Sequence, residues 1–166
     1  MTGRTPRSSR PIREREFHRW LARTLPSGRG GLLPLGDDAA ALSPPPGRVA
    51  VVSTDTLVEG FHFLPKSPPA RVGAAAAGVS FSDLAAKGAV PDAILLALVL
   101  PRGSPRSWAE AVVRGAERFG SRFGAHVVGG DTKPGPTRVV VSTVLGWGRR
   151  TDLAPRSGAR PGDLLG

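Results

Sequence analysis

Hydrophobic and polar residues alternate in blocks that predict helices and strands. In residues 12–25 the apolar side chains recur three and four positions apart, which is typical of one face of a helix. Two further helices are expected after Ser-Pro pairs, at residues 67–87 and 104–123. Short apolar or β-branched runs predict strands at 39–42, 49–53, 93–100, 125–128 and 138–147. This order indicates an α+β domain with one mixed sheet of about four main strands covered by helices.

Two of these segments carry further expectations. The run 93–100 is apolar throughout, so it is expected to be a central strand buried on both faces. It is too short for a membrane span, which needs about 20 residues. The predicted helix 67–87 contains the small residues 73–78, so it is expected to pack closely against the sheet and to draw Asp83 into the interior.

Composition narrows the class of protein. The 166 residues include no Cys, which excludes disulfides, thiolate metal sites and cysteine nucleophiles. No secretory signal is visible, so we expect a cytoplasmic protein without a membrane anchor. The net charge is +10, and eight arginines lie in the first 30 residues. They could form an arm that binds nucleic-acid phosphates. A solvated, disordered arm over residues 1–11 is favoured, because no aromatic residues or nucleic-acid-binding motifs accompany them.

Acidic residues are scarce, and five of the eight aspartates lie in four stretches of small and hydroxyl-bearing residues. We expect these stretches at strand ends or at the end of a helix: 36–40, 53–56, 80–86 and 129–132. Each alone fits an ordinary turn or cap. Together their hard oxygen ligands predict Mg²⁺ bound beside a nucleoside triphosphate.

Several motifs are absent. The sequence has no P-loop, no Gly-x-Gly-x-x-Gly after a strand and no kinase catalytic loop. The three histidines, His18, His62 and His126, lack zinc-site spacing. His62 could contact a phosphate or stack on a ring, although its spacing alone favours an ordinary core histidine.

The four stretches, followed by residues 156–163, resemble the thiamine-monophosphate kinase family from about Phe17 to the last residue. That family is similar to aminoimidazole ribonucleotide synthetase, selenophosphate synthetase and a hydrogenase maturation protein. The resemblance implies an N-terminal α+β domain whose sheet pairs with that of a second copy to form a barrel. It also implies ATP-dependent phosphorylation of thiamine monophosphate to thiamine diphosphate.

The resemblance also implies roles for particular residues, although no catalytic side chain is assigned because the transfer is metal-assisted. The implied Mg²⁺ ligands are Asp38, Ser53, Thr54, Asp55, Asp83 and Asp131, with Asp37 ranked below Asp38. His62 is implied to contact the substrate. ATP contacts are implied for Gly130, Asp131 and Arg156. Phe81, Lys87 and Phe123 depart from the family pattern, and Phe123 stands where a Tyr is usual.

The expected organisation is a basic arm (1–11), an ATP- and Mg²⁺-binding domain (12–148) and the start of a linker (149–166) to a C-terminal domain that the chain lacks. The expected partners are thiamine monophosphate, ATP and a second copy, and the chain alone is expected to be incomplete. Two alternatives stay open. One is another ATP-dependent enzyme of the same group, and the other is a non-catalytic dimerisation or nucleic-acid-binding module.

Overall fold

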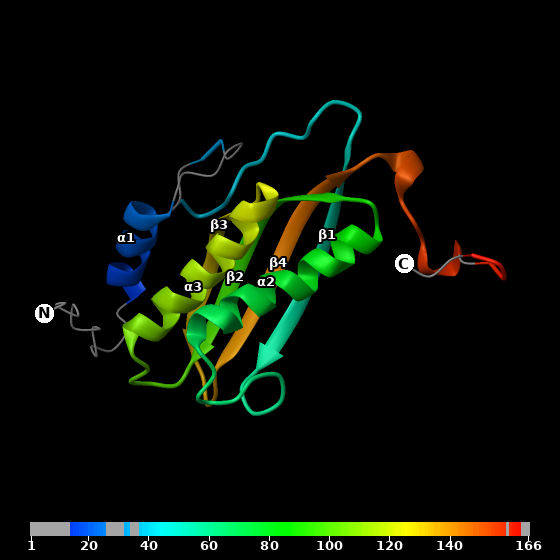
Figure 1. Cartoon of the computed structure of the whole chain (residues 1–166). Coiled ribbons are helices and arrows are strands. Elements are labelled where there is room, and N and C mark those ends of the chain that lie inside the picture. The colour runs from blue at the N-terminus through cyan, green and yellow to red at the C-terminus, as the bar shows by residue number, and fades with distance from the viewer. Residues whose placement is uncertain (1–13, 26–31, 34–36, 159, 164–166) are drawn as a thin grey trace, which may run out of the picture.

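The computed structural model describes residues 14–25, 32–33, 37–158 and 160–163. Three α-helices and four β-strands make up its main body (Figure 1). In chain order they are α1 (Glu14–Thr24), β1 (Val49–Val58), α2 (Pro69–Ala86), β2 (Val90–Leu100), α3 (Arg106–Gly120), β3 (His126–Pro134) and β4 (Val139–Gly148). A short 3-10 turn lies between α3 and β3 at Ser121–Phe123, and two more come after β4, at Arg150–Asp152 and Arg156–Gly158.

The strands form a single mixed sheet in the order β1-β4-β2-β3. β4 is antiparallel to both of its neighbours, whereas β2 and β3 are parallel and are joined through α3. Figure 1 shows α2 and α3 side by side on one face of this sheet, with α1 beyond α3 on the β3 side. The predicted fold class, an α+β domain with about four main strands, is confirmed.

The hydrophobic core lies between the sheet and its two covering helices. Every second residue of β4 is buried, because alternate side chains of a strand point to opposite faces. No helix of the described residues covers the other face, and there Val52 is 58% exposed and Leu95 is 41% exposed. The expectation that 93–100 is buried on both faces is therefore wrong for a single copy of this chain. We call this surface the helix-free face, with Val52, Thr54, Leu95, Val141 and Thr143 among its residues.

The small residues of α2 do pack closely, but the closest backbone approach is to α3 and not, as the sequence predicts, to the sheet. A Cβ atom added at Gly73 would lie 1.9 Å from the carbonyl oxygen of Val112. Asp83 is not drawn into the interior, which corrects the prediction. It lies on the exposed side of the last turns of α2, because buried positions such as Leu84 occupy the other side.

Three predicted boundaries are wrong. Residues 53–56 lie inside β1 and residues 129–132 lie inside β3, whereas both were expected at strand ends. A register shift opposite Ile94 and Leu95 and a positive φ of 153° at Gly130 let β3 continue through its two glycines. Residues 39–42 form no named strand. The expected arm, 1–11, lies outside the described residues.

Candidate functional site

The first part of the candidate site lies where the last turns of α2 cross β1. The Ser53 hydroxyl donates a hydrogen bond to Asp83 Oδ2 over 2.6 Å, although the two residues are 30 positions apart. Asp55 is two residues further along β1 and therefore shares the helix-covered side of the strand with Ser53. We call Ser53, Asp55 and Asp83 the β1 half-site.

Thr54 does not join this group, because strand alternation turns its side chain to the helix-free face. There its hydroxyl lies 2.9 Å from that of Thr143, directly opposite on β4. Thr143 attracted no attention in the sequence, since a threonine in a Val-rich strand looks like ordinary strand composition.

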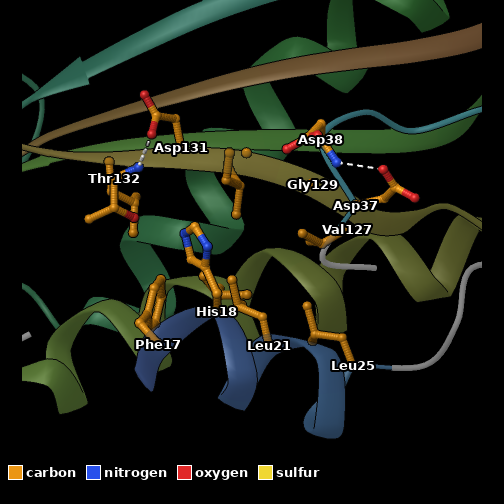
Figure 2. Close-up of a pocket in the computed structure, with 14 residues that line it drawn as sticks. Phe17, His18, Leu21, Leu25, Asp37, Asp38, Val127, Gly129, Asp131 and Thr132 are labelled. Atoms are coloured by element: carbon orange, nitrogen blue, oxygen red, sulfur yellow. Dashed lines mark hydrogen bonds between the residues drawn. The ribbon is translucent and has the colours of Figure 1, made fainter. Parts of the chain in front are cut away.

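The second part of the candidate site surrounds a cavity of about 240 Å³ between α1 and β3 (Figure 2). Its lining is apolar where it meets the core and polar near Asp37, Asp38 and Asp131. At Gly130 a Cβ would lie 1.8 Å from the Leu96 carbonyl oxygen, so only glycine fits there. We call Asp37, Asp38, Gly130 and Asp131 the β3 half-site.

Local hydrogen bonds distinguish the two adjacent aspartates. The backbone N–H of Asp38 donates to Asp37 Oδ1 over 2.7 Å, so the Asp37 carboxylate caps its own turn. The Asp38 carboxylate makes no hydrogen bond or ion pair with the described residues. Asp38 is therefore the better placed of the two to bind a ligand, in keeping with its higher rank.

Neighbouring groups favour the ionised form of Asp131. Lys133 Nζ lies 2.9 Å from Asp131 Oδ1, and the backbone N–H of Thr132 donates to the same oxygen over 2.8 Å. The hydrogen bond from Lys133 is the main cause that lowers the pKa of Asp131 below its ordinary value. In Figure 2 the carboxylate points away from α1, to the other side of β3.

His18 is a candidate that the sequence did not single out. Its ring points from α1 toward β3 across the cavity (Figure 2). The electrostatic influence of His18 is the smallest of the causes that lower the pKa of Asp131. The sequence offered one signal for His18, namely its position beside the apolar Phe17, which is buried in the structure.

The two half-sites lie at opposite edges of the sheet. β4 and β2 separate β1 from β3, and three inter-strand steps correspond to roughly 14 Å. No three acidic or histidine side chains gather into a metal-binding cluster among the residues that the structure describes. One copy therefore brings Ser53 and Asp83 together, and it places Asp38 and Asp131 around the same cavity. It does not unite these two pairs.

His62 and Arg156 lie outside both half-sites. His62 is exposed on the turn after β1, so the interpretation as an ordinary core histidine is wrong. Arg156 lies in the tail, residues 149–158, which passes close to the C-terminal end of α2 (Figure 1). Lys87 holds that tail by donating a hydrogen bond to the Ala154 carbonyl over 2.9 Å. The tail thus lies on the side of the molecule that carries Asp83.

Comparison with known proteins defines the class. Residues 36–148 match the family described as AIR synthase related protein, N-terminal domain, and the chain belongs to this family. A relative named thiamine-monophosphate kinase, from Synechococcus elongatus, is 43% identical over 149 residues, which cover 83% of this chain and 46% of the relative. The resemblance to thiamine-monophosphate kinases is thereby confirmed.

Solved structures agree with this relationship. The thiamine-monophosphate kinase of Stenotrophomonas maltophilia matches with a TM-score of 0.69 and 36% identity, over 83% of this chain and 42% of the other. A complex described as AaThiL with AMPPCP and TMP matches with a TM-score of 0.65 and 30% identity, over 71% and 38%. The chain thus spans less than half the length of each of these relatives. No described helix is long and apolar enough to cross a bilayer.

Proposed function

We propose that the chain is the N-terminal, nucleotide-binding domain of a cytoplasmic thiamine-monophosphate kinase. The observation that carries the proposal is the similarity to thiamine-monophosphate kinases over most of the chain. In the proposed reaction a phosphate oxygen of thiamine monophosphate forms a bond to the γ-phosphorus of ATP. The bond from that phosphorus to the β,γ-bridging oxygen breaks, and ADP leaves with the electron pair.

The donor set of the β1 half-site fits Mg²⁺. A hydroxyl and a carboxylate already lie 2.6 Å apart, and both are hard oxygen ligands. Mg²⁺ is commonly held by one or two carboxylates together with substrate phosphates and water, so a small protein half-set is sufficient. Ser53, Asp55 and Asp83 would hold the ion, which would supply neutralisation of phosphate charge.

The β3 half-site is suited to the polyphosphate. Gly130 and Asp38 line the cavity, so an exposed backbone and a carboxylate are available there, while the Asp131 carboxylate lies on the other side of β3. Two carboxylates would repel a bare triphosphate, so we propose that they bind it through further Mg²⁺ ions. We assign ATP contacts to Gly130, Asp131 and Arg156, and Thr54 stays a predicted ligand.

A second copy of the chain is the proposed means of uniting the half-sites. β1 and β3 are the two edge strands, and the helix-free face between them exposes apolar side chains such as Val52 and Leu95 beside Thr54 and Thr143. Two such faces packed together would place β1 of one copy beside β3 of the other and close the sheets into a barrel. Sedimentation of the chain at several concentrations tests this, and a monomer at every concentration would contradict it.

The activity is tested by ADP release from ATP with thiamine monophosphate, by the chain alone and by the chain joined to the C-terminal part of the Synechococcus relative. We expect turnover in the joined protein that requires both thiamine monophosphate and Mg²⁺. Other phosphate monoesters serve as the competing substrates. ADP release that responds to one of these and not to thiamine monophosphate would place the chain with another enzyme of the family.

The metal assignment is tested by Asp83→Asn, with Asp152→Asn as a matched exposed control. We expect Asp83→Asn to weaken Mg²⁺-dependent ATP binding by about tenfold or more, because one of few ligand charges is lost. Thermal stability should change little, since Asp83 is exposed and an amide oxygen still accepts the Ser53 hydroxyl. Equal affinity in calorimetric titrations of both variants would refute the assignment.

A further inference from the structure

The turn that carries His62 runs from Glu59 to Phe63, and its base, formed by these two residues, is held against the body of the domain. We propose that Arg138 is a positioning residue, which fixes this turn so that the Nε2–H of His62 faces the phosphate of the substrate. The inference rests on the proposed function for the identity of the substrate. The anchoring itself is a property of this chain and can be measured separately.

Hydrogen bonds within the turn determine which imidazole nitrogen is available. The backbone N–H of Val58 donates to His62 Nδ1 over 3.1 Å, and the N–H of His62 donates to the Val58 carbonyl over 2.8 Å. A ring nitrogen that accepts a hydrogen bond carries no proton, so the neutral imidazole has its proton on Nε2. The exposed nitrogen of His62 is therefore a donor, as recognition of a phosphate oxygen requires.

The base of the turn is held by Arg138. Its Nη1 donates to Glu59 Oε1 over 2.8 Å, and its carbonyl accepts the backbone N–H of Glu59 over 3.0 Å. The guanidinium also lies 4.9 Å from the centroid of the Trp108 ring on α3. The Arg138 and Glu59 side chains are only 21% and 15% exposed, so solvent screens this ion pair weakly.

The other end of the turn rests on the same tryptophan. Phe63 stacks on Trp108 with ring centroids 6.4 Å apart, and Glu59 and Phe63 are bridged to each other. Between these two residues the tip makes little contact with the body, since Phe61 is 87% exposed. The orientation of His62 therefore depends on the anchored base and not on packing of the tip.

The test compares Arg138→Met with Arg106→Met. Methionine keeps much of the aliphatic volume and removes the charge. The control pair, Arg106 with Glu110, has a 2.7 Å contact and side chains 21% and 20% exposed, so it matches in geometry and burial. Nitrogen-15 NMR of the imidazole reports the His62 tautomer, and hydrogen exchange reports protection of the Val58 amide.

In Arg138→Met we expect mixed His62 tautomers and about tenfold faster exchange of the Val58 amide, because a charge-assisted hydrogen bond is lost. Arg106→Met should leave both signals unchanged, and Arg138→Lys should restore them in part. In the active joined protein, Arg138→Met should raise the KM for thiamine monophosphate about tenfold with kcat within about twofold. Glu59→Gln is the milder variant if Arg138→Met fails to fold.

Two results would overturn the proposal. One is a folded Arg138→Met protein with the wild-type tautomer and protection, and the other is an equal change in Arg106→Met. The two proposals can fail separately. If the NMR change is confined to Arg138→Met but the joined protein does not phosphorylate thiamine monophosphate, the positioning role of Arg138 is supported and only the proposed function is refuted.

Discussion

Replacing Gly73 by Ala should destabilise the domain, although alanine is the better helix former. The new Cβ would lie 1.9 Å from the Val112 carbonyl oxygen, whereas real Cβ contacts are essentially never below 3.0 Å. The helices α2 and α3 must therefore separate by at least 1.1 Å at this point. Such overpacking costs about 1–3 kcal/mol and is opposed by a gain in helix propensity of about 1 kcal/mol.

We expect a net loss of up to about 2 kcal/mol, which lowers the melting temperature by up to roughly 8 °C for a domain of this size. The matched control is Gly78→Ala in the same helix, where the new Cβ meets only the Phe119 ring at 3.4 Å. That variant should be stabilised by up to about 1 kcal/mol. Thermal unfolding followed by circular dichroism compares the two, and a Gly73→Ala protein as stable as Gly78→Ala would refute the close-packing argument.

Two further predictions concern charged groups. Lys133→Met should raise the pKa of Asp131 toward its ordinary value, as measured by NMR titration of the carboxyl carbon. Because the folded-state pKa of Asp131 is lowered, its contribution to stability is present above the unfolded-state pKa and disappears as the pH falls through the folded-state value. The variant should therefore lose less stability between neutral and acid pH, and an unchanged titration would contradict the role of Lys133. Glu117→Ala should lower the free energy of unfolding, measured with denaturant, by about 1–3 kcal/mol. Glu117 accepts a hydrogen bond from the Val127 N–H at 2.8 Å and contacts His126 Nδ1 at 2.7 Å. An unchanged midpoint would show that water replaces the carboxylate.

Local patterns predicted the helices well. The expected ranges 12–25, 67–87 and 104–123 correspond to α1, α2 and α3 with shifts of a few residues at the ends. Helix spacing and Ser-Pro pairs are short-range signals, so the helices that they predict depend little on the tertiary context. The four-stranded mixed sheet was predicted for the same reason, and its strand order was not, because register depends on contacts distant in sequence.

The strand that carries Gly129 and Gly130 shows why other predictions failed. Two adjacent glycines usually signal a turn, but here Gly130 allows close approach of β3 to the Leu96 backbone, and Gly129 lies against the Leu95 side chain. The contact between Ser53 and Asp83 was anticipated only as part of a common metal site. The separation of Thr54 from its neighbours follows from strand alternation, which became decisive once β1 proved to continue to Val58.

The separation of the half-sites limits how this chain can act on a nucleotide. A Mg²⁺ ion reaches only about 2.1 Å to each ligand, so no single ion can join carboxylates on strands roughly 14 Å apart. Rotamer changes do not close that gap either, because β4 and β2 fill the space between the two edges. Within one copy the two half-sites therefore cannot share an ion, so either each half-site binds its own ion or a shared ion lies between two copies. If a strictly monomeric chain bound Mg²⁺ and ATP with affinity that fell in both Asp83→Asn and Asp131→Asn, the proposed pairing of edges would be refuted, whereas the assignment of oxygen ligands would stand.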